Sequence, residues 1–238
     1  MSNRYFSDSP LSVGPALLAG PEAHHLIHVM RAVRGLRIVL FDGGGAEFPA
    51  VVERVGRDQV ELDVLAREEV DRELPFAVTL GVAVPKGDRQ RWLVEKAVEL
   101  GVTRLVPLWT QRGVAQPVQQ AIARLRRAVI EASKQCGRNR LMAVGEPHSW
   151  LDYLQRAPTT SGRWLAQPKG FHKGVPLFAT DGPSEQYWLA VGPEGGLSSA
   201  EVSLAVAAGW HTVDLGPRIL RVETAALLLA SLVTQLVA

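Results

Sequence analysis

The sequence predicts an α/β protein in two parts, with a small antiparallel β-sheet or barrel in residues 1–72 and a parallel sheet covered by helices in residues 73–238. Three observations lead to this fold class. Short strand patterns on tight turns fill the first part. Strand and helix patterns alternate along the second part, which is typical of a parallel sheet with helices on both faces. The charged stretch 67–73, followed by Pro75, is a natural linker between the two parts.

In the first part, an extended segment at residues 4–6 precedes a helix over residues 21–32. Pro21 suits the first turn of that helix, where an N–H group is not needed. Strands are expected at residues 36–41, 47–55 and 59–65, with Gly-rich turns between them. His24 and His28 lie one helical turn apart, which is metal-ligand spacing, but no third ligand accompanies them, so we predict no metal site.

The second part begins with an apolar strand at residues 76–84, and Asp88 ends the polar loop that follows it. Asp88 is suited to cap a helix over residues 89–100. Strands at residues 103–108, 141–144 and 163–166 then alternate with helices at residues 117–136 and 150–155. A polar loop covers residues 167–173.

The C-terminal stretch, residues 187–238, carries the most informative local pattern. A strand at residues 187–191 leads into Gly192-Pro193-Glu194-Gly195-Gly196, which suits neither helix nor strand. Ser198 and Glu201 form a capping-box pattern for a helix that runs to about residue 208. A strand at residues 211–215 and a second tight loop precede a mainly apolar helix from about residue 223. That helix should be buried in the core or in a subunit interface.

The position of these two C-terminal loops indicates a ligand site. In an open α/β sheet, ligands bind beside loops that follow the carboxyl ends of strands. Neither GxGxxG at the first strand–helix junction nor GxxxxGK[ST] occurs, so the sequence predicts neither a dinucleotide-binding fold nor a P-loop. The residues alone therefore predict an α/β domain with a ligand site near its C-terminal loops.

Composition limits the setting in which the protein works. The chain has one cysteine, Cys136, so it can form no internal disulfide bond, and a reducing, cytoplasmic location is expected. The N-terminal residues lack the apolar stretch of a signal peptide. No apolar run reaches the roughly 18 residues that a membrane-spanning helix needs, so no membrane partner is expected.

Basic residues are concentrated in one stretch, although the net charge of the chain is only +2. Residues 112–140 contain one acidic residue, Glu131, and seven basic ones, namely Arg112, Arg124, Arg126, Arg127, Lys134, Arg138 and Arg140. The guanidinium group of arginine suits phosphate binding and base stacking, so this stretch favours an RNA partner. A solvated helix face is the alternative explanation.

The motif Gly192-Pro193-Glu194-Gly195-Gly196, followed by LGPRILRVETA at residues 215–225, resembles the C-terminal motifs of the SPOUT superfamily of methyltransferases. More narrowly, it resembles the ribosomal RNA small-subunit methyltransferase E family. The segments EKAVELG at residues 95–101 and QCGRNR at residues 135–140 extend the resemblance over most of the chain.

This resemblance implies a PUA-like RNA-binding β-barrel in residues 1–72 and a SPOUT methyltransferase domain, whose parallel sheet contains a trefoil knot, in residues 73–238. It implies S-adenosylmethionine as cofactor and a homodimer. The implied reaction is methylation of the ring N3 of a specific uridine in small-subunit (16S) ribosomal RNA, within the assembled small subunit.

The resemblance also implies which residues bind the cofactor. Backbone groups of the two C-terminal loops would hold its adenosine part, with contacts from Val191, Gly192, Glu194, Gly196, Leu215, Gly216, Ile219 and Leu220. Ordinary core packing is the alternative role for Ile219 and Leu220.

Arg221 and Glu223 stand at the start of the C-terminal helix and are the candidate catalytic pair. Arg221 would stabilise the negative charge that grows on the uracil as its proton leaves, and Glu223 would accept that proton or orient Arg221. An ion pair that caps the helix is the structural alternative, and Glu194 is a second candidate base.

The candidate RNA contacts are Arg4, Arg31, Arg34, Arg112, Arg138 and Arg218. Three other functions stay open at this point. One is a SPOUT methyltransferase that acts on tRNA or large-subunit rRNA, at a base or a ribose. Another is a non-catalytic RNA-binding factor for ribosome assembly, against which the intact loop glycines argue. The last is an α/β enzyme for a small molecule.

Overall fold

The computed structural model describes residues 3–113, 119–168, 172–173 and 184–235, and the chain divides into two compact units. Unit 1 comprises Met1–Glu73 and Ser133–Leu141, and unit 2 comprises Leu74–Ala132 and Met142–Ala238. The predicted helix start at Pro117 lies outside the described residues. None of the helices in the described ranges has the length and apolar composition needed to cross a membrane.

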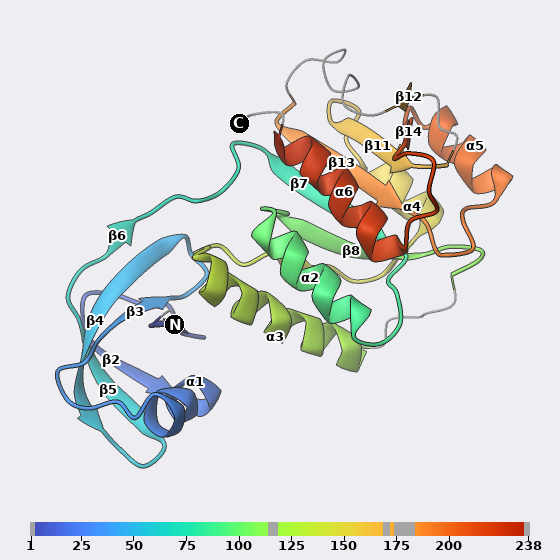
Figure 1. The fold of residues 1–238 in the computed structure, drawn as a ribbon. Coiled ribbons are helices and arrows are strands. Elements are labelled where there is room, and N and C mark those ends of the chain that lie inside the picture. The colour runs from blue at the N-terminus through green and yellow to red at the C-terminus, as the bar shows by residue number, and fades with distance from the viewer. Residues whose placement is uncertain (1–2, 114–118, 169–171, 174–183, 236–238) are drawn as a thin grey trace. The chain divides into compact units, whose positions relative to one another are not determined.

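Unit 1 contains a mainly antiparallel sheet in the order β1-β3-β4-β5-β2, with β6 beside β4 (Figure 1). Only the β1–β3 pairing of this sheet is parallel among the described residues. Its core includes Tyr5, Leu26, Leu40 and Phe48. The strands are β1 (Arg4–Phe6), β2 (Gly14–Ala19), β3 (Arg37–Phe41), β4 (Ala46–Val55), β5 (Gln59–Val64) and β6 (Glu68–Glu69).

The helix of unit 1 is shorter than predicted. It consists of α1 (Gly20–His24) and a π-helical turn, η1 (His25–Val29). Arg31 then adopts φ of 52°, in the left-handed region, which ends the helix before residue 32. Strand β2 was not predicted, because its sequence GPALLA begins with two residues that usually mark a turn.

A buried carboxylate ties Ser133–Leu141 into unit 1. Oε1 of Glu47 accepts hydrogen bonds from Arg4 and Arg72. Nη2 of Arg4 also donates to Oδ1 of Asn139 at 2.6 Å, and Nη1 of Arg72 donates to the carbonyl oxygen of Gly137 at 2.8 Å. Burial alone raises the pKa of Glu47, but the hydrogen bonds from Arg72 and Arg4 outweigh it, so the pKa lies below its usual range.

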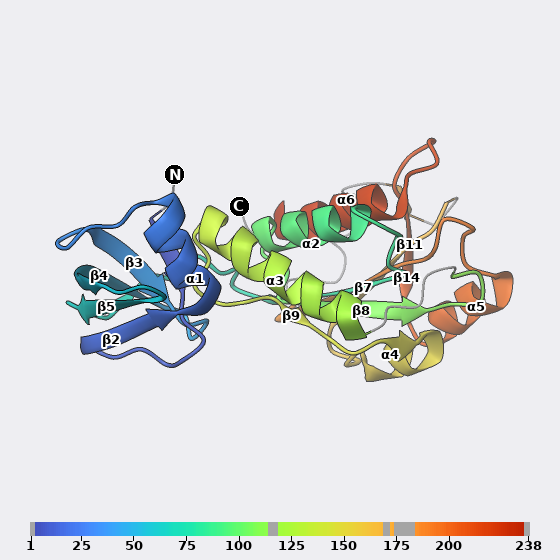
Figure 2. The ribbon, with the colours of Figure 1, turned by 90° about the horizontal axis from the view of Figure 1, so that it is seen from below.

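Unit 2 contains a parallel sheet in the order β10-β8-β7-β13-β11-β14-β12, with β9 beside β8. Helices α2 and α6 lie together on one face of this sheet, and α4 and α5 lie on the other (Figure 2). The strands are β7 (Ala77–Val82), β8 (Arg104–Trp109), β9 (Ala143–Val144), β10 (His148–Ser149), β11 (Gly162–Ala166), β12 (His172–Lys173), β13 (Gln186–Val191) and β14 (His211–Asp214). The helices are α2 (Arg89–Glu99), α3 (Gln119–Cys136), α4 (Trp150–Arg156), α5 (Ser199–Ala207) and α6 (Val222–Thr234), and the last residues of α3, from Ser133 on, belong to unit 1.

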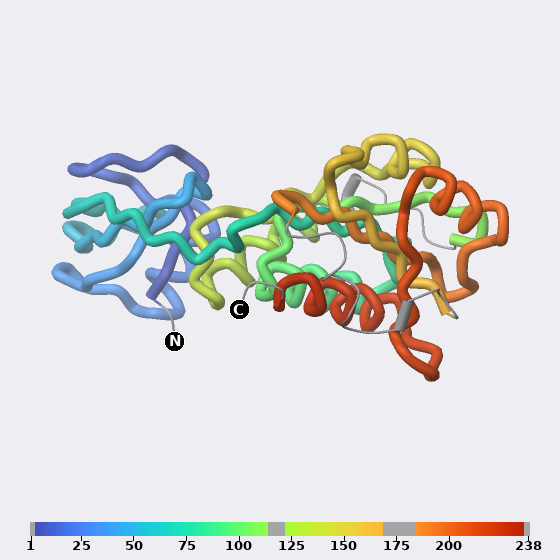
Figure 3. Tube along the Cα trace, turned by 90° about the horizontal axis from the view of Figure 1, so that it is seen from above, coloured from blue at the N-terminus to red at the C-terminus, as the bar shows by residue number. Residues whose placement is uncertain are grey.

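The four central strands end in one row. Val82 of β7 is paired with Val191 of β13, Val191 with Ala166 of β11, and Ala166 with Val213 of β14. Because the strands are parallel, the loops that follow them all leave from the same edge of the sheet. Figure 3 follows the chain from β13 through α5 and β14, in orange, to α6, in red.

One of the two predicted helix caps is confirmed. The hydroxyl of Ser198 accepts from the N–H of Glu201, and the Glu201 carboxylate accepts from the N–H of Ser198 at 2.8 Å, which completes the capping box. The predicted cap by Asp88 is wrong. Asp88 precedes α2, but its backbone is already helical and its side chain accepts no capping hydrogen bond.

A glycine in β7 makes room for the ring of Tyr153. Tyr153 on α4 is fully buried, and its hydroxyl donates to the carbonyl oxygen of Leu189 at 2.8 Å. A Cβ atom at Gly81 would lie 2.4 Å from Cζ of that ring. Ring and backbone are in direct contact there, so the sheet and α4 fit only while this position is glycine.

We predict that Gly81→Ala lowers the free energy of unfolding by about 3 kcal/mol, because the methyl group overlaps a ring that is packed on every side. Thermal unfolding followed by tryptophan fluorescence measures the change, since all six tryptophans belong to unit 2. Gly145→Ala is the control, because a Cβ there is 3.6 Å from its nearest neighbours. Equal stability of the two variants would contradict the packing argument.

We predict that Glu47→Gln destabilises unit 1 at pH 7 by about 3 kcal/mol, because the largely buried Arg4 and the partly exposed Arg72 lose their shared counter-charge. The pKa of Glu47 is lowered in the folded state, so the stabilisation is present above the ordinary value of 4.5 and is lost as the pH falls through the folded pKa. Hydrogen exchange of the backbone amides of β3 and β4, followed from pH 7 to pH 4, measures this loss of stability locally.

Glu61→Gln is the control for this measurement, because Glu61 pairs with Arg54 on the exposed surface. The Glu61→Gln substitution should change the hydrogen exchange of β3 and β4 little at any pH. A Glu47→Gln effect that stays constant as the pH falls would show that packing, and not the charge, is responsible.

Candidate functional site

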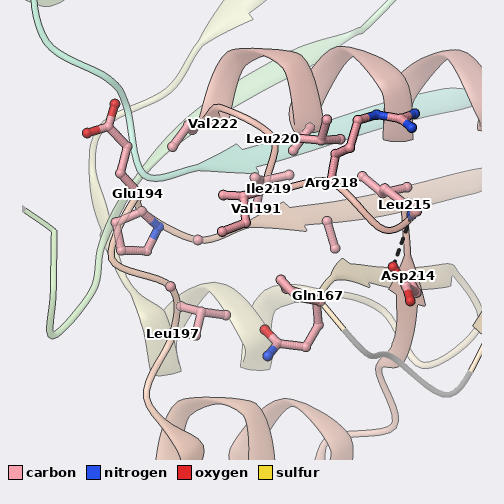
Figure 4. A pocket seen from close by; sticks show the side chains of 17 residues that line it. Gln167, Val191, Glu194, Leu197, Asp214, Leu215, Arg218, Ile219, Leu220 and Val222 are labelled. Atoms are coloured by element: carbon pink, nitrogen blue, oxygen red, sulfur yellow. Dashed lines mark hydrogen bonds between the residues drawn. The ribbon is translucent and has the colours of Figure 1, made fainter.

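A pocket lies at the carboxyl ends of β11, β13 and β14, beside the start of α6 (Figure 4). Seventeen residues line it, and they come from four segments of unit 2. These are Ala166–Pro168 after β11, Val191–Glu194 with Gly196 and Leu197 after β13, Asp214–Gly216 with Arg218–Leu220 after β14, and Val222 with Ala225 of α6. The site therefore forms where three neighbouring parallel strands end, as expected for an open α/β sheet.

Two glycines give the pocket its backbone surface. Gly196 and Gly216 have φ of 70° and 111°, which side-chain-bearing residues rarely adopt. A Cβ at either position would meet nothing within 4 Å, so both glycines border open space. The N–H of Gly196 donates to the carbonyl oxygen of Pro193 at 2.8 Å and closes the turn. The pocket therefore borders backbone at these two glycines with no side chain in between.

The walls of the pocket are mainly aliphatic. In Figure 4, Leu215, Ile219 and Leu220 face Leu197 and Gln167 across the pocket. Ile219 is 96% exposed, so it does not belong to the core. Polar atoms are few. Asp214 accepts the N–H of Gly216 at 3.0 Å through Oδ1, and the Gln167 side chain points inward from the end of β11. Such a surface suits a flat apolar group with a few hydrogen-bonding edges.

The start of α6 brings a buried carboxylate close to the pocket. Glu223 is 5% exposed, and its Oε2 lies 3.7 Å from Nη1 of Arg89 on α2. Within the described residues, Oε2 of Glu223 has no hydrogen-bond partner. Arg221, the N-cap residue of α6, is exposed and makes no ion pair with Glu223 in the described part of the chain. The capping ion pair considered from the sequence is therefore replaced by an Arg89–Glu223 pair.

A second pocket adjoins the first at the same edge of the sheet. It lies beyond the end of β7 and is lined by Ala83, Val84, Pro85, Lys86, Arg89, Gly113, Pro193, Glu194 and Val222. Pro193, Glu194 and Val222 line both pockets. The two pockets are separated only by this shared wall, so ligands bound in them would be neighbours.

Arg89 connects the two carboxylates at this wall. Its Nη1 donates to Oε1 of Glu194 and lies near Glu223. The hydrogen bond from Arg89, together with its charge, holds the pKa of Glu194 below its usual range. Sequence patterns gave no sign of this arrangement, because Arg89 is more than a hundred residues before its partners, with Glu194 at a separation of 105.

The structure brings together all eight residues predicted to bind a cofactor, since each of them lines the first pocket. Their binding role stays a prediction. Sequence reasoning missed Gln167, Leu197 and Asp214, which line the same pocket. Gln167 and Asp214 could have been found, because each stands where a predicted strand ends, which is the same signal that identified the glycine loops.

Two arginines predicted to contact RNA have a structural role. The side chains of Arg4 and Arg138 are only 11% and 5% exposed. Arg4 pairs with Glu47, and Nε of Arg138 donates to Oε1 of Glu73 at 3.0 Å. Their guanidinium groups are committed to carboxylates within unit 1, so the predicted RNA contact does not fit them. The sequence does not reveal these distant partners.

The other four predicted RNA contacts are exposed. Arg31 and Arg34 follow η1 in unit 1, and Arg34 forms a surface ion pair with Glu53. In unit 2, Nη1 of Arg112 donates to the carbonyl oxygen of Gly195 at 3.0 Å, beside the first pocket. Arg218 lines that pocket, and its guanidinium group points away from the middle of it (Figure 4).

Possible metal ligands do not gather in the described residues, where no group of three or more His, Cys, Asp or Glu side chains could hold an ion. His24 and His28 stack with ring centroids 4.5 Å apart. The pair is exposed on the helix of unit 1.

Comparisons with known proteins agree with this architecture. The RNA methyltransferase domain family matches residues 72–234, and the RNA methyltransferase PUA domain family matches residues 18–65. The ribosomal RNA small subunit methyltransferase E of Bacillus subtilis strain 168 is 32% identical over 88% of this chain and 86% of its own length. The protein of the same name from Synechocystis is 33% identical over 87% of this chain and 69% of its own.

A solved structure gives the same result at the level of the fold. The crystal structure of a ribosomal RNA small subunit methyltransferase E from Neisseria gonorrhoeae, bound to S-adenosyl methionine, superimposes with a TM-score of 0.90 at 30% identity. The match covers 99% of this chain and 98% of that one.

We predict that Arg89→Ala raises the pKa of Glu194 towards its ordinary value of 4.5, because the hydrogen bond and the charge that lower it are lost. The Glu194–Arg89 attraction exists above the lowered pKa and is lost as the pH falls through it. Carboxyl carbon NMR titration of Glu194 measures the shift. Arg91→Ala, which removes a charge on α2 that pairs with Glu95, should leave the Glu194 titration unchanged.

Proposed function

We propose, from the premise that this chain belongs to the ribosomal RNA small subunit methyltransferase E family, that it transfers a methyl group from S-adenosylmethionine to the ring N3 of a uridine in small-subunit (16S) ribosomal RNA, in the cytoplasm. The observation that carries the proposal is the pair of adjoining pockets at one edge of the unit 2 sheet. A methyl transfer needs two such sites in contact, because donor and acceptor must be aligned for direct attack.

The first pocket fits the cofactor. Its aliphatic walls, formed by residues such as Leu197, Leu215 and Ile219, suit a flat adenine ring. The backbone at Gly196 and Gly216 borders open space, and because the N–H groups of both glycines already donate to Pro193 and Asp214, their carbonyl groups are the main-chain groups proposed to meet the cofactor. Asp214 and Gln167 supply polar atoms for a ribose. Each residue predicted to bind the cofactor takes part in this proposal, and the bound cofactor would supply an activated methyl group on a sulfonium.

The residues of the chain have to orient the uracil and remove its N3 proton. We assign proton acceptance to Glu223, because its buried Oε2 has no hydrogen-bond partner in the described residues. Arg221, at the N-cap of α6, is proposed to stabilise negative charge on the uracil. Loss of turnover in Glu223→Gln with retained cofactor binding would support this assignment, and full turnover at neutral pH would exclude it.

The RNA contacts proposed for this chain are those of the exposed arginines, Arg31, Arg34, Arg112 and Arg218. The PUA domain match to residues 18–65 supports an RNA-binding role for unit 1. If Arg31 and Arg34 bind phosphates, replacing either by alanine should reduce the slope of log affinity against log salt by about one. An unchanged slope would remove that arginine from the RNA interface.

We propose that the chain forms a homodimer. Trp92 on α2 and Leu228 on α6 are 46% and 37% exposed, and Ile219 precedes α6 with its side chain open to solvent. Exposed apolar groups on two helices that pack together favour an interface. Sedimentation velocity tests the proposal, and a chain that stays monomeric at about ten times its working concentration would refute it.

Methyl transfer from labelled S-adenosylmethionine to small ribosomal subunits that lack their own modifications tests the reaction. Mass analysis of the nucleosides should find N3-methyluridine at one site. Transfer to tRNA or large-subunit RNA instead would keep the chemistry and change the substrate. Cofactor binding without any transfer would favour a non-catalytic RNA-binding factor.

We predict that Gly192→Ala weakens S-adenosylmethionine binding by about tenfold or more, because a Cβ there would lie 2.7 Å from Cγ of Leu197 and would push this side chain into the pocket. Isothermal titration calorimetry measures the affinity. Gly195→Ala is the matched control, since a Cβ there would be 3.5 Å from its nearest neighbour, Arg112. Equal affinities for the two variants would contradict the prediction.

A further inference from the structure

The second pocket of unit 2 offers a mixed set of hydrogen-bonding groups inside apolar walls. Ala83, Val84 and Pro85 follow β7 and form one part of its lining, and Pro193 and Val222 form the wall shared with the first pocket. Lys86 and Arg89 are the cationic residues of this lining, and Glu194 is its carboxylate. Apolar surface beside a few convergent polar groups is typical of a specific ligand site.

Arg89 relates this pocket to a second, buried carboxylate. Its Nη1 lies 3.7 Å from the unpartnered Oε2 of Glu223 and donates to Glu194 on the exposed side. The side chain of Arg89 is 35% exposed, and that of Glu223 is 6% exposed. A guanidinium group has five N–H donors, so Arg89 keeps donors for a ligand while it holds Glu194. Two cationic residues and the carboxylate of Glu194 therefore line the second pocket, and the carboxylate of Glu223, which is not part of this lining, lies next to Arg89.

The donor and acceptor groups of this pocket are of the types that the Watson–Crick edge of uracil requires. That edge presents a carbonyl oxygen, the N3–H group and a second carbonyl oxygen. The matching protein surface needs a donor, an acceptor and a donor in that order. Cytosine has an unprotonated N3 at the same place, so a carboxylate facing it would find no proton to accept. A wall of this charge and hydrogen-bonding character would therefore favour uracil over cytosine, although the two bases are similar in size.

We propose that the second pocket receives the target uracil, flipped out of the RNA, with Arg89 and Lys86 facing its carbonyl oxygens and its N3–H directed to Glu223, the carboxylate next to Arg89. This inference rests on the proposed function and deepens it by naming the acceptor site. In the step, the N3–H proton passes to the carboxylate of Glu223 and N3 forms its bond to the methyl group. The carbon–sulfur bond of the donor breaks, and the sulfur keeps the electron pair as a neutral thioether.

Arg89 has a distinct part in this arrangement. As the N3 proton leaves, negative charge grows on the carbonyl oxygens of the uracil. The nearby guanidinium group of Arg89, which is partly buried, stabilises this charge. The pairing with Glu194 keeps Arg89 at the shared wall before the uracil binds. Arg89 is therefore a residue that contacts the substrate, in addition to the Arg221 and Glu223 pair.

Binding of nucleotides to the whole protein tests the site apart from the reaction. Saturation-transfer NMR titrations with uridine 5′-monophosphate and cytidine 5′-monophosphate, in the presence of S-adenosylhomocysteine, compare the wild type with Arg89→Ala, Arg89→Lys and Arg91→Ala. Arg91→Ala is the matched control, because Arg91 lies on α2, pairs with Glu95 and does not line the pocket.

We expect the wild type and Arg91→Ala to bind the uridine nucleotide at least about tenfold more tightly than the cytidine nucleotide. Arg89→Ala should lose about tenfold or more of the uridine affinity, and Arg89→Lys should recover part of it. S-adenosylhomocysteine affinity within about twofold of the wild-type value confirms that each variant is folded. In the methyl-transfer assay, Arg89→Ala should have a lower kcat, while Arg91→Ala should not.

Two results would overturn the inference. One is equal binding of the uridine and cytidine nucleotides, and the other is an Arg89→Ala variant that matches Arg91→Ala in binding and in turnover. A wild-type protein that binds the uridine nucleotide through Arg89 but transfers no methyl group to any subunit would refute the proposed reaction and leave the uracil pocket standing.

Discussion

The in-register pairing of four parallel strands is the constraint on which the functional end of this protein depends. Val82, Val191, Ala166 and Val213 stand in one row across β7, β13, β11 and β14. Parallel pairing sends every following loop to the same side, so three loops converge on the first pocket and the loop after β7 reaches the second. A slip of one residue in β13 would turn its buried side chains to the other face of the sheet.

The strand β13 has a central place in this arrangement, because its loop forms the wall between the two pockets. Gly192 allows the loop to pass close to Leu197, and Gly196 turns it with a positive φ. The capping box of Ser198 and Glu201 then fixes where α5 begins, and Oε1 of Glu201 also accepts the N–H of Gln111 at 2.8 Å. The end of the loop is thus held in place where α5 begins.

Charged residues that look alike in the sequence have different roles in the structure. Arg4 and Arg138 form ion pairs with Glu47 and Glu73 inside unit 1, whereas Arg112 and Arg218 are exposed near the first pocket. Removing an arginine from water is costly unless a carboxylate compensates it, so Arg4 and Arg138 depend on these partners within the fold. A count of charges along the chain cannot separate these classes, because the partners lie 43 and 65 residues away.

The sequence by itself determined the order of the longer strands and helices in the second part, the two glycine loops and the capping box, because these depend on periodicity and on local backbone preferences. It missed the two-residue strands β10 and β12, the second of which lies in the predicted polar loop. The resemblance of the two loops to known motifs named eight residues for a cofactor, and all eight line the first pocket, while their binding role stays a prediction. Only the tertiary structure decided that Glu223 faces Arg89 in place of Arg221, that Ser133–Leu141 belongs to unit 1, and that a second pocket exists. These features join residues far apart in the chain, and their physical cause is the packing of whole elements, which no local pattern encodes.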